Sequence, residues 1–350
     1  MFNVGIIGVG SISSAHINAY LNHPEATILA LCDMNQQRLE EKGEAYQVKH
    51  LYTNYQELLA NPSIDAVSIC TWNNTHAEMT IAALQAGKHV LVEKPLSMTV
   101  EEAIAVENAA KQSDKIVQVG FVRRHGVNAQ VLKSFMDHGE LGEIYYAKAT
   151  CLRRLGNPGG WFSEHTKSGG GPLIDLGVHM IDLCWYLMGK PKPVSVVGKT
   201  YHKLGNRSNI ENLSYYKAAD YDPNHNNVED LASAFIKFDN GASLFVDVSF
   251  TLHLKQDEVS IKLFGDQGGA ELEPRLNIIT EKHDTILNIE PQIDHSTFHF
   301  PVAFSKEIAH FVECCQTGRE SIAPVADGVV IMRILEKIYE SAKTEKEQIF

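Results

Sequence analysis

Cysteine is scarce in this chain, and its six cysteines show no regular spacing. None forms a C-x-x-C pair and most lie in apolar stretches, so we interpret them as reduced packing residues rather than disulfide partners or metal ligands. Long apolar runs are also lacking, since none approaches the roughly 18 residues of a membrane-spanning helix. The first strand-like stretch begins at Asn3, which leaves no room for a signal peptide. We therefore expect a cytoplasmic protein.

Clusters of basic residues are missing as well. The 31 lysines and arginines are outnumbered by 43 aspartates and glutamates, which gives a formal net charge of −12 at pH 7. Without a basic cluster, the chain is not expected to bind nucleic acid or an anionic membrane surface. The charge is compatible with a small neutral substrate.

The chain is long enough for two domains, and its two halves differ in pattern. At 350 residues it exceeds the size at which one hydrophobic core usually stops growing. From residue 3 to residue 120, short apolar stretches such as VGIIG, AVSIC and HVLVE alternate with segments of helical periodicity. This alternation is typical of a doubly wound parallel sheet. We assign residues 1–122 to this α/β domain and residues 123–350 to a second, substrate-binding domain.

The second half has longer strands in which apolar and polar residues alternate, at 143–154, 230–238 and 242–250. Asp239-Asn240-Gly241, between the last two, predicts a β-hairpin. We expect an α/β domain with a large, mostly antiparallel open sheet. One helix is expected to start near Gly171, and another to span 326–342 and to be able to pack back on the first domain. We interpret the polar stretch 203–227 as a long loop.

The stretch GIIGVGSISSAH carries the first chemical signal. Gly8 and Gly10 follow a predicted strand and precede a predicted helix, where glycine lets the backbone approach a dinucleotide pyrophosphate. The next fingerprint position prefers glycine or alanine but holds Ser13. Asp33, at the end of the second strand, can accept hydrogen bonds from an adenosine ribose, although a turn aspartate is its plain structural alternative. Together these features predict a nucleotide site in a Rossmann domain.

Asp33 also predicts which nucleotide binds. A 2′-phosphate about 4 Å from this carboxylate would be repelled by it. At a surface-like dielectric this repulsion costs on the order of 4 kcal/mol per unit charge. No arginine follows at once to offset this repulsion. We therefore expect NAD as the cofactor and NADP as the less favoured one.

The stretch HVLVEKPLS places an acid, a base and a proline directly after a buried strand. Glu93 and Lys94 then lie at the carboxyl edge of the parallel sheet, where open α/β sheets bind ligands. Pro95 favours an extended Lys94 and permits a cis bond. Near a nicotinamide, Lys94 could hydrogen-bond a substrate hydroxyl and stabilise a developing alkoxide. For this motif alone, a solvated loop lysine is the alternative.

The stretch SGGGPLIDLGVHMIDLCWYL predicts a helix with a polar face. Asp175, His179 and Asp182 lie four and then three residues apart, so they can share one face of that helix. A histidine can accept a proton from an alcohol near neutral pH, and an adjacent carboxylate would orient it. Taken singly, His179 could be a satisfied core histidine and Asp175 a helix-start residue. The spacing also allows a metal site, but no further ligand is evident and we expect no metal.

Four motifs in this order, GVGSISSAH, TWNNTH, AGKHVLVEKPLS and GGGPLIDLGVHMIDL, resemble the glucose-fructose oxidoreductase / inositol dehydrogenase / rhizopine catabolism (Gfo/Idh/MocA) family. The resemblance covers nearly the whole chain, including LFGDQGGAELE. It implies a Rossmann domain, a second domain whose open sheet often serves oligomerisation, and NAD(P)-dependent oxidation or reduction of a sugar, cyclitol or related polyol. It also implies a catalytic group of Lys94, the helix carboxylate Asp175 and the proton-transfer residue His179, with Arg123 lining the site.

These motifs supply the candidate contact residues. Cofactor contacts are expected at Gly8, Gly10, Ser11, Ile12, Asp33, Thr71, Asn73, His76, Glu93 and Lys94. Substrate contacts are expected at Lys94, Arg123, Trp161, Asp175 and His179.

Some positions depart from the family pattern or have two interpretations. Trp72 stands where proline is common, and His125 stands where an aromatic residue often follows the arginine pair. Trp161 and Phe162 lie in a glycine-rich segment just before the predicted catalytic helix. Trp161 either covers the substrate or fixes its loop to the core.

Assembly and activity leave further alternatives. The stretches SAFIKF and SLFVDVSF are too apolar on both faces for either face to stay in water, so we expect a homodimer or homotetramer through this sheet. An NAD-retaining glycoside hydrolase of the same fold is an alternative function. A non-catalytic NAD- and sugar-responsive regulator is another, which the presence of Lys94, Asp175 and His179 disfavours.

Overall fold

The computed structural model describes residues 1–218, 220–222 and 224–350. These residues form two compact units, each described by itself below. The first comprises Met1–His125 and Phe300–Met332, and the second comprises Gly126–His299 and Arg333–Phe350. This division differs from a single boundary at residue 122, because a later segment packs on the first sheet.

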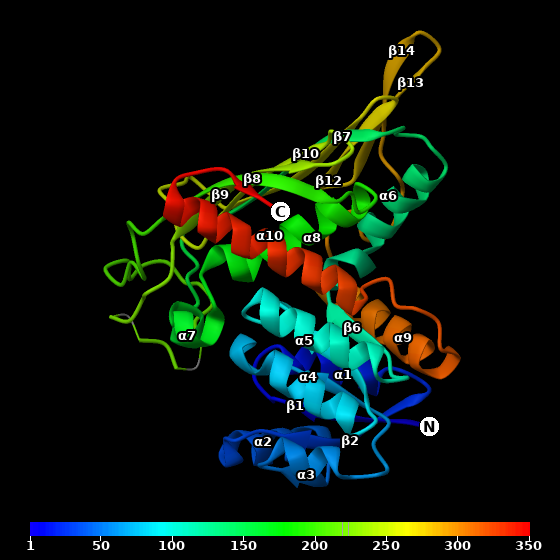
Figure 1. Cartoon of the computed structure of the whole chain (residues 1–350), viewed down its shortest axis with the longest axis vertical. Coiled ribbons are helices and arrows are strands. Elements are labelled where there is room, and N and C mark those ends of the chain that lie inside the picture. Colours follow the sequence, from blue (N-terminus) through cyan, green and yellow to red (C-terminus); the bar gives the residue numbers. More distant parts are fainter. Residues whose placement is uncertain (219, 223) are drawn as a thin grey trace. The chain divides into compact units, whose positions relative to one another are not determined.

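The first unit contains a six-stranded sheet in the order β3-β2-β1-β4-β5-β6. Figure 1 labels β1, β2 and β6 of this sheet. Its strands, all paired in parallel, are β1 (Phe2–Ile7), β2 (Ala26–Cys32), β3 (His50–Tyr52), β4 (Ala66–Ile69), β5 (His89–Glu93) and β6 (Val117–Gly120). Strands β4 and β6 are buried at every position, as expected for a parallel sheet covered on both faces. The predicted doubly wound parallel sheet is confirmed.

The helices of the first unit mostly follow its strands. They are α1 (Ser13–Leu21), α2 (Gln36–Tyr46), α3 (Tyr55–Leu59), α4 (His76–Gln85), α5 (Val100–Lys111) and α9 (Phe300–Thr317), with the 3-10 turns η1 (Asn73–Thr75) and η2 (Val122–His125). Helix α1 packs against α9, and α4 packs against α5. After α9 the chain joins the edge of the sheet, since the amide of Val119 donates to the carbonyl of Ala323 at 2.9 Å. Helix α10 (Val325–Thr344) then contributes residues to both units.

The second unit contains a nine-stranded sheet in the order β14-β13-β12-β11-β7-β10-β9-β8-β15. Its strands are β7 (Ile144–Leu152), β8 (Pro193–Tyr201), β9 (Leu231–Phe238), β10 (Ser243–Ser249), β11 (Glu258–Gly265), β12 (Gly268–Glu273), β13 (Asn277–Lys282), β14 (Thr285–Ile289) and β15 (Gln348–Ile349). The pair β7 and β10 is parallel, and the other pairs are antiparallel. The mostly antiparallel sheet is confirmed, as is the hairpin from β9 to β10, in which Gly241 has a φ of 85°.

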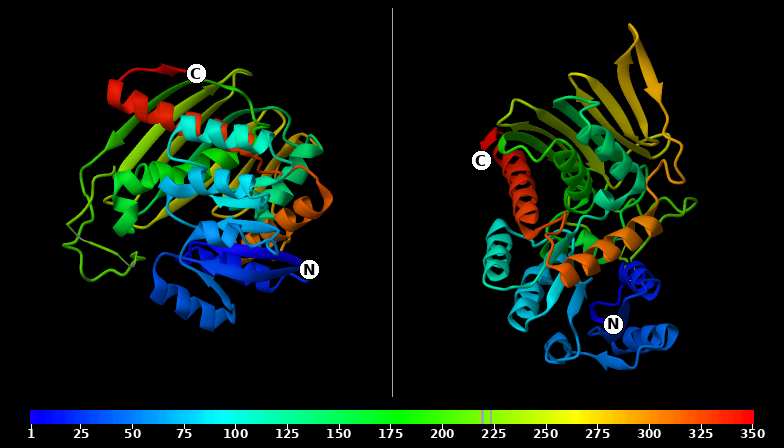
Figure 2. Two further views of the ribbon diagram at one scale, coloured as in Figure 1. Left: turned by 60° about the horizontal axis from the view of Figure 1, so that its bottom comes forward. Right: turned by 90° about the vertical axis from the view of Figure 1, so that its right-hand side faces the viewer.

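Helices cover one face of this nine-stranded sheet (Figure 2). They are α6 (Val127–Asp137), the π-helical turn η4 (Leu173–Gly177), α8 (Val178–Leu187) and the part of α10 that belongs to this unit, while η3 (Gly160–Ser163) and α7 (His165–Ser168) precede them. The approach of α10 is close, because a Cβ on Gly198 of β8 would lie 2.7 Å from Ile338. Between β8 and β9, the described residues of 203–227 contain no helix or strand, as predicted.

Candidate functional site

The glycine turn lies between β1 and α1, at the carboxyl edge of the parallel sheet. Gly8 has a φ of 87°, and a Cβ there would come within 2.8 Å of the main chain of Cys70, so this position requires glycine. A Cβ on Gly10 would meet no described atom within 4 Å. Ile12, the N-cap residue of α1, has an apolar side chain that cannot cap the first turn. The turn and the helix start therefore fit the pyrophosphate of a dinucleotide.

Asp33 follows β2 at the same edge and braces the glycine turn. Its Oδ2 accepts a hydrogen bond from the amide of Val9 and its Oδ1 accepts one from the amide of Asn35, both at 2.8 Å. The side chain stays partly exposed, so ribose hydroxyls can reach it. Sequence reasoning missed Arg38 on α2, whose Nη1 lies 4.0 Å from Oδ2 of Asp33. Arg38 is the third residue of α2 and lies five positions after Asp33, beyond the residues that directly follow the strand.

The predicted cofactor residues Thr71, Asn73 and His76 lie between the end of β4 and the start of α4. The ring of His76 is buried, with Nδ1 2.7 Å from the carbonyl oxygen of Pro95 and Nε2 3.1 Å from that of Thr71. Burial lowers the pKa of His76 although both carbonyls oppose the shift. His76 thus ties the loop after β4 to the loop after β5.

At the end of β5, Glu93 is buried and Lys94 is partly exposed. Oε1 of Glu93 accepts a hydrogen bond from Nε2 of His16 at 2.8 Å, and Oε2 accepts one from the main-chain amide of Lys94 at 3.2 Å. Burial alone would raise the pKa of Glu93, but the hydrogen bond and attraction of His16, together with Lys94, lower it overall. Glu93 is therefore a carboxylate that fixes the main chain at Lys94. The Lys94-Pro95 bond is cis.

The predicted substrate residue Arg123 has a buried neighbour that fixes its backbone. The guanidinium of Arg124 is fully buried, and its Nη1 lies 2.6 Å from Oδ2 of Asp327 and donates to the carbonyl of Ile322 at 2.5 Å. Both partners belong to the later segment of the first unit. These contacts hold η2, on which Arg123 is half-buried.

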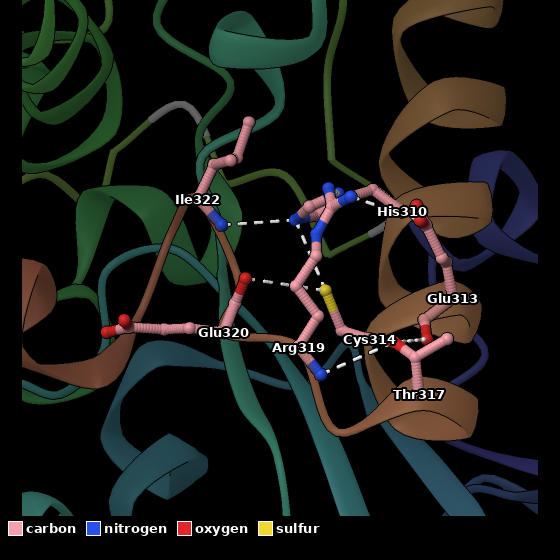
Figure 3. A network of polar contacts seen from close by, with 7 residues as sticks. All are labelled: His310, Glu313, Cys314, Thr317, Arg319, Glu320 and Ile322. Atoms are coloured by element: carbon pink, nitrogen blue, oxygen red, sulfur yellow. Dashed lines mark hydrogen bonds and ion pairs between the residues drawn. The ribbon is translucent and has the colours of Figure 1, made fainter.

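A polar network at the end of α9 anchors the loop that carries Ile322 (Figure 3). The amide of Ile322 donates to Nε2 of His310 at 3.1 Å, and Nη1 of Arg319 donates to Oε1 of Glu313 at 3.0 Å. The ring of His310 also packs on His125 at a centroid distance of 5.3 Å. Burial, reinforced by His310 and nearby cations, lowers the pKa of His125 to about 3. His125 is thus a neutral aromatic group at a position where an aromatic residue is expected.

In the second unit, the predicted catalytic helix begins with a π-helical turn. This turn, η4, includes Asp175, and α8 then carries His179. Asp175 and His179 are half-buried, whereas Asp182 is only 1% exposed. Of the predicted polar face, the first two side chains therefore keep access to solvent and the third belongs to the core. Such π-turns are frequent at functional sites.

Glu229, which sequence reasoning missed, holds the amino end of this helix. Its carboxylate, on a residue that is 3% exposed, accepts hydrogen bonds from the amides of Gly171 at 2.9 Å and Leu173 at 3.1 Å and from the hydroxyl of Tyr339 at 2.8 Å. Burial raises the pKa of Glu229 although these bonds oppose the shift. A Cβ on Gly171 would lie 2.4 Å from the carbonyl oxygen of Glu229, so the approach requires glycine.

Trp161 and Phe162 form a half-buried aromatic pair, with ring centroids 3.9 Å apart and an interplanar angle of 29°. Their loop is joined to the long segment 203–227 by buried amide contacts. In one of these, Nδ2 of Asn157 donates to Oδ1 of Asn206 at 2.7 Å. The long segment therefore fixes the loop, while both aromatic rings keep exposed surface.

The predicted site residues are divided between the two units. Lys94 and Arg123 belong to the first, and Trp161, Asp175 and His179 belong to the second. Among the described residues, no group of three or more His, Cys, Asp or Glu side chains is placed to hold a metal ion. No helix in that part of the chain is both long and apolar enough to cross a membrane.

Comparison with known proteins decides the family. Residues 2–121 match the oxidoreductase family with an NAD-binding Rossmann fold, and residues 129–271 match the GFO/IDH/MocA C-terminal domain. The chain belongs to the GFO/IDH/MocA oxidoreductase family. It is an NAD-dependent dehydrogenase, and its first unit contains the NAD-binding Rossmann domain.

Relatives with named activities match along nearly their whole length. The chain is 31% identical over 345 residues to D-glucoside 3-dehydrogenase of Escherichia coli K12, which covers 97% of this chain and 95% of that protein. It is 29% identical over 335 residues to scyllo-inositol 2-dehydrogenase (NAD(+)) of Bacillus subtilis 168, covering 94% and 90%. A solved structure of levoglucosan dehydrogenase with NADH and levoglucosan is similar in fold, with a TM-score of 0.87, 23% identity and 99% coverage of both chains.

Proposed function

We propose that this dehydrogenase oxidises a secondary ring hydroxyl of a neutral D-glucoside or related sugar, with a cyclitol as the second candidate. The observation that carries the proposal is the likeness to D-glucoside 3-dehydrogenase, which extends over 97% of the chain and so includes both units. The nearly equal likeness to scyllo-inositol 2-dehydrogenase supports the second candidate. The two substrate classes share the chemistry of a ring carbon that carries both a hydrogen and a hydroxyl.

The cofactor is held by residues of the first unit. Gly8, Gly10 and the start of α1 bind the pyrophosphate, and Asp33 binds the adenosine ribose. Further contacts come from Ser11, Ile12, Thr71 and Asn73, while His76 and Glu93 contribute by fixing the loops around them. When bound, NAD supplies the acceptor for the hydride that leaves the alcohol carbon.

The proton and the developing charge are each handled by a named side chain. His179 takes the hydroxyl proton, and the ammonium group of Lys94 stabilises the alkoxide that develops as the C–H bond breaks. Asp175 favours the protonated form of His179 by its negative charge. Arg123 donates hydrogen bonds to other hydroxyls, and the partly exposed ring of Trp161 packs on the apolar C–H face of the sugar.

Purified protein mixed with NAD and a panel of glucosides, free sugars and inositols tests this function. We expect NADH to form fastest with an alkyl glucoside or with an inositol, depending on which candidate is right. A panel without any NADH formation would contradict the proposal. Release of the leaving group from a chromogenic glycoside without net NADH would instead identify the glycoside hydrolase alternative.

The cofactor preference gives a first prediction. NAD should bind at least about tenfold more tightly than NADP, a difference of roughly 1.4 kcal/mol. Asp33→Ser should narrow this gap, because it removes the carboxylate that opposes a 2′-phosphate and leaves Arg38 available to attract one. Fluorescence titration of both nucleotides measures the effect.

Arg38→Ala is the matched control for this prediction. It removes the cation and keeps the carboxylate, so it should widen the gap between NAD and NADP. Equal affinities for the two nucleotides in the unaltered protein would show that Asp33 does not select the cofactor.

The second prediction concerns assembly through the uncovered face of the nine-stranded sheet. A row across this face contains Val197, Phe235 and Phe245, which are paired in register, and Lys148 lies over the Phe245 ring at 5.5 Å. Val197 is 49% exposed, which is unfavourable for a flat apolar face in water. We expect a homodimer or homotetramer through this face.

Sedimentation at micromolar concentration measures the assembly state. Phe235→Glu should dissociate the oligomer, because it places a charge in the middle of the apolar row, and it should leave NAD affinity unchanged. As a control, Ile286→Glu alters an exposed residue on β14, away from this row, and should not dissociate the protein. A monomeric unaltered protein would contradict the prediction.

A further inference from the structure

The first unit contains a buried carboxyl group, Glu307 on α9, that the proposed mechanism does not use. The residue is 0% exposed, and neither of its carboxyl oxygens has a hydrogen-bond partner among the described residues. A charged carboxylate in such a place is strongly disfavoured. Burial, reinforced by the charge of Glu93, raises the pKa of Glu307 well above its ordinary value. Glu307 therefore keeps its proton to a higher pH than an ordinary glutamate does.

A second unpaired polar atom lies in the same packing layer between α1 and α9. His16 donates from Nε2 to Glu93, but its buried Nδ1 has no partner among the described residues. The His16 ring meets Phe304 edge-on, with centroids 5.2 Å apart. Phe304 and Glu307 are three residues apart and so lie on the same face of α9. A carboxylic acid has both a donor and an acceptor, so it can pair with Nδ1 whether or not that nitrogen carries a proton.

We propose that Glu307 is a positioning residue that completes a buried hydrogen-bonded chain to Lys94. Its carboxylic acid pairs with Nδ1 of His16 through one bridging water molecule. Nε2 of His16 holds Oε1 of Glu93, and Oε2 of Glu93 holds the main-chain amide of Lys94 at 3.2 Å. The chain fixes the backbone from which the Lys94 ammonium group extends. This inference rests on the role of Lys94 in the proposed function.

The surrounding groups make the chain sensitive to the charge of Glu307. The titratable groups that interact electrostatically with Glu307 are Tyr20 on α1, Cys70 after β4 and Glu93 on β5, and His16 on α1 is hydrogen-bonded to Glu93. Burial raises the pKa values of Tyr20 and Cys70 well above their ordinary values, so both are neutral. Ionised Glu307 would therefore place a second negative charge near Glu93. The chain holds together while Glu307 keeps its proton.

The protonation state is tested by the stability of Glu307→Gln against pH. Since the pKa of Glu307 is raised in the folded state, its stabilising contribution is complete below the unfolded pKa, about 4.3, and falls as pH rises toward the folded pKa. The glutamine variant lacks this loss. The melting temperature of the variant minus that of the unaltered protein should therefore increase from pH 5 to pH 8. A difference that stays constant would show that Glu307 is ionised like an ordinary glutamate, which would overturn the proposal.

The positioning role is tested by comparing three variants. Glu307→Leu should lower kcat by about tenfold, which is the scale of loss when a residue that supports a functional group is removed. It should also speed hydrogen exchange in the peptide that contains Lys94. Glu307→Gln keeps a neutral hydrogen-bond donor, so its kcat and its hydrogen-exchange rate should both stay within about twofold of those of the unaltered protein. Val312→Ala alters a buried residue of the same helix. It should lower the melting temperature and leave kcat and the exchange rate unchanged.

These measurements separate the inference from the proposed function. Equal effects of the leucine and glutamine substitutions, whether both are silent or both are damaging, would overturn the positioning role. Full turnover in a Lys94→Ala protein would contradict the function of Lys94 instead. The exchange and melting measurements would still decide whether Glu307 fixes that backbone, because neither depends on turnover.

Discussion

Replacing His179 with alanine should lower turnover by about a hundredfold or more while leaving NAD affinity nearly unchanged. General base catalysis typically contributes about 10²- to 10⁴-fold to the rate. His179 lies on α8 in the second unit, whereas the glycine turn and Asp33 lie in the first. Turnover is measured as NADH formation at saturating substrate, and NAD affinity by fluorescence titration.

Melting temperature separates this role from a packing role. If His179 only filled space, the alanine variant would lose stability and its residual activity would follow the folded fraction. Met180→Ala, at a buried neighbouring position of α8, shows what a packing loss alone does. It should melt earlier than the unaltered protein and keep its turnover per folded molecule. A His179→Ala protein that melts and turns over normally would rule out the proposed proton transfer.

The fold could be predicted from the sequence where its elements are set by local patterns. The alternation of apolar strands and helices indicated the parallel sheet, and Asp239-Asn240-Gly241 indicated the hairpin between β9 and β10. The parallel pairing of β7 with β10 could not be predicted, because strand order depends on long-range packing rather than on periodicity. The place of Phe300–Met332 in the first unit was missed for the same reason.

The candidate site divides in a similar way. The residues proposed to face ligands lie in short motifs, so Gly8, Lys94 and His179 could be singled out as candidates from the sequence. The residues that support them come from distant parts of the chain. Glu229 caps the helix that carries His179 from across the second unit. No local sequence pattern encodes such a contact, since it exists only after the chain has folded.

Replacing Lys94 with alanine should also lower turnover by about a hundredfold or more, and it should raise KM as well. The ammonium group is proposed to contact the substrate hydroxyl before and during hydride transfer, so its loss removes both binding and transition-state stabilisation. His179→Ala, which removes a proton acceptor, should affect mainly kcat. The ratio of the effects on KM therefore distinguishes the two side chains, and steady-state kinetics over a range of substrate concentrations measures it.

Two further lysine variants show whether charge or position decides the effect of Lys94→Ala. Lys111→Ala removes a lysine from an exposed ion pair with Glu107 on α5 and should change neither constant, because such pairs contribute little. Lys94→Arg keeps the positive charge but replaces a compact ammonium group with a wide planar guanidinium. In our proposal Lys94 donates a hydrogen bond to one hydroxyl oxygen, and Glu93 fixes the backbone from which the lysine side chain extends. If this is right, Lys94→Arg should restore substrate affinity more fully than turnover. Full recovery of substrate affinity and turnover in Lys94→Arg would show that a nearby positive charge is sufficient. Unchanged kinetics in Lys94→Ala would show that Lys94 takes no part in the mechanism.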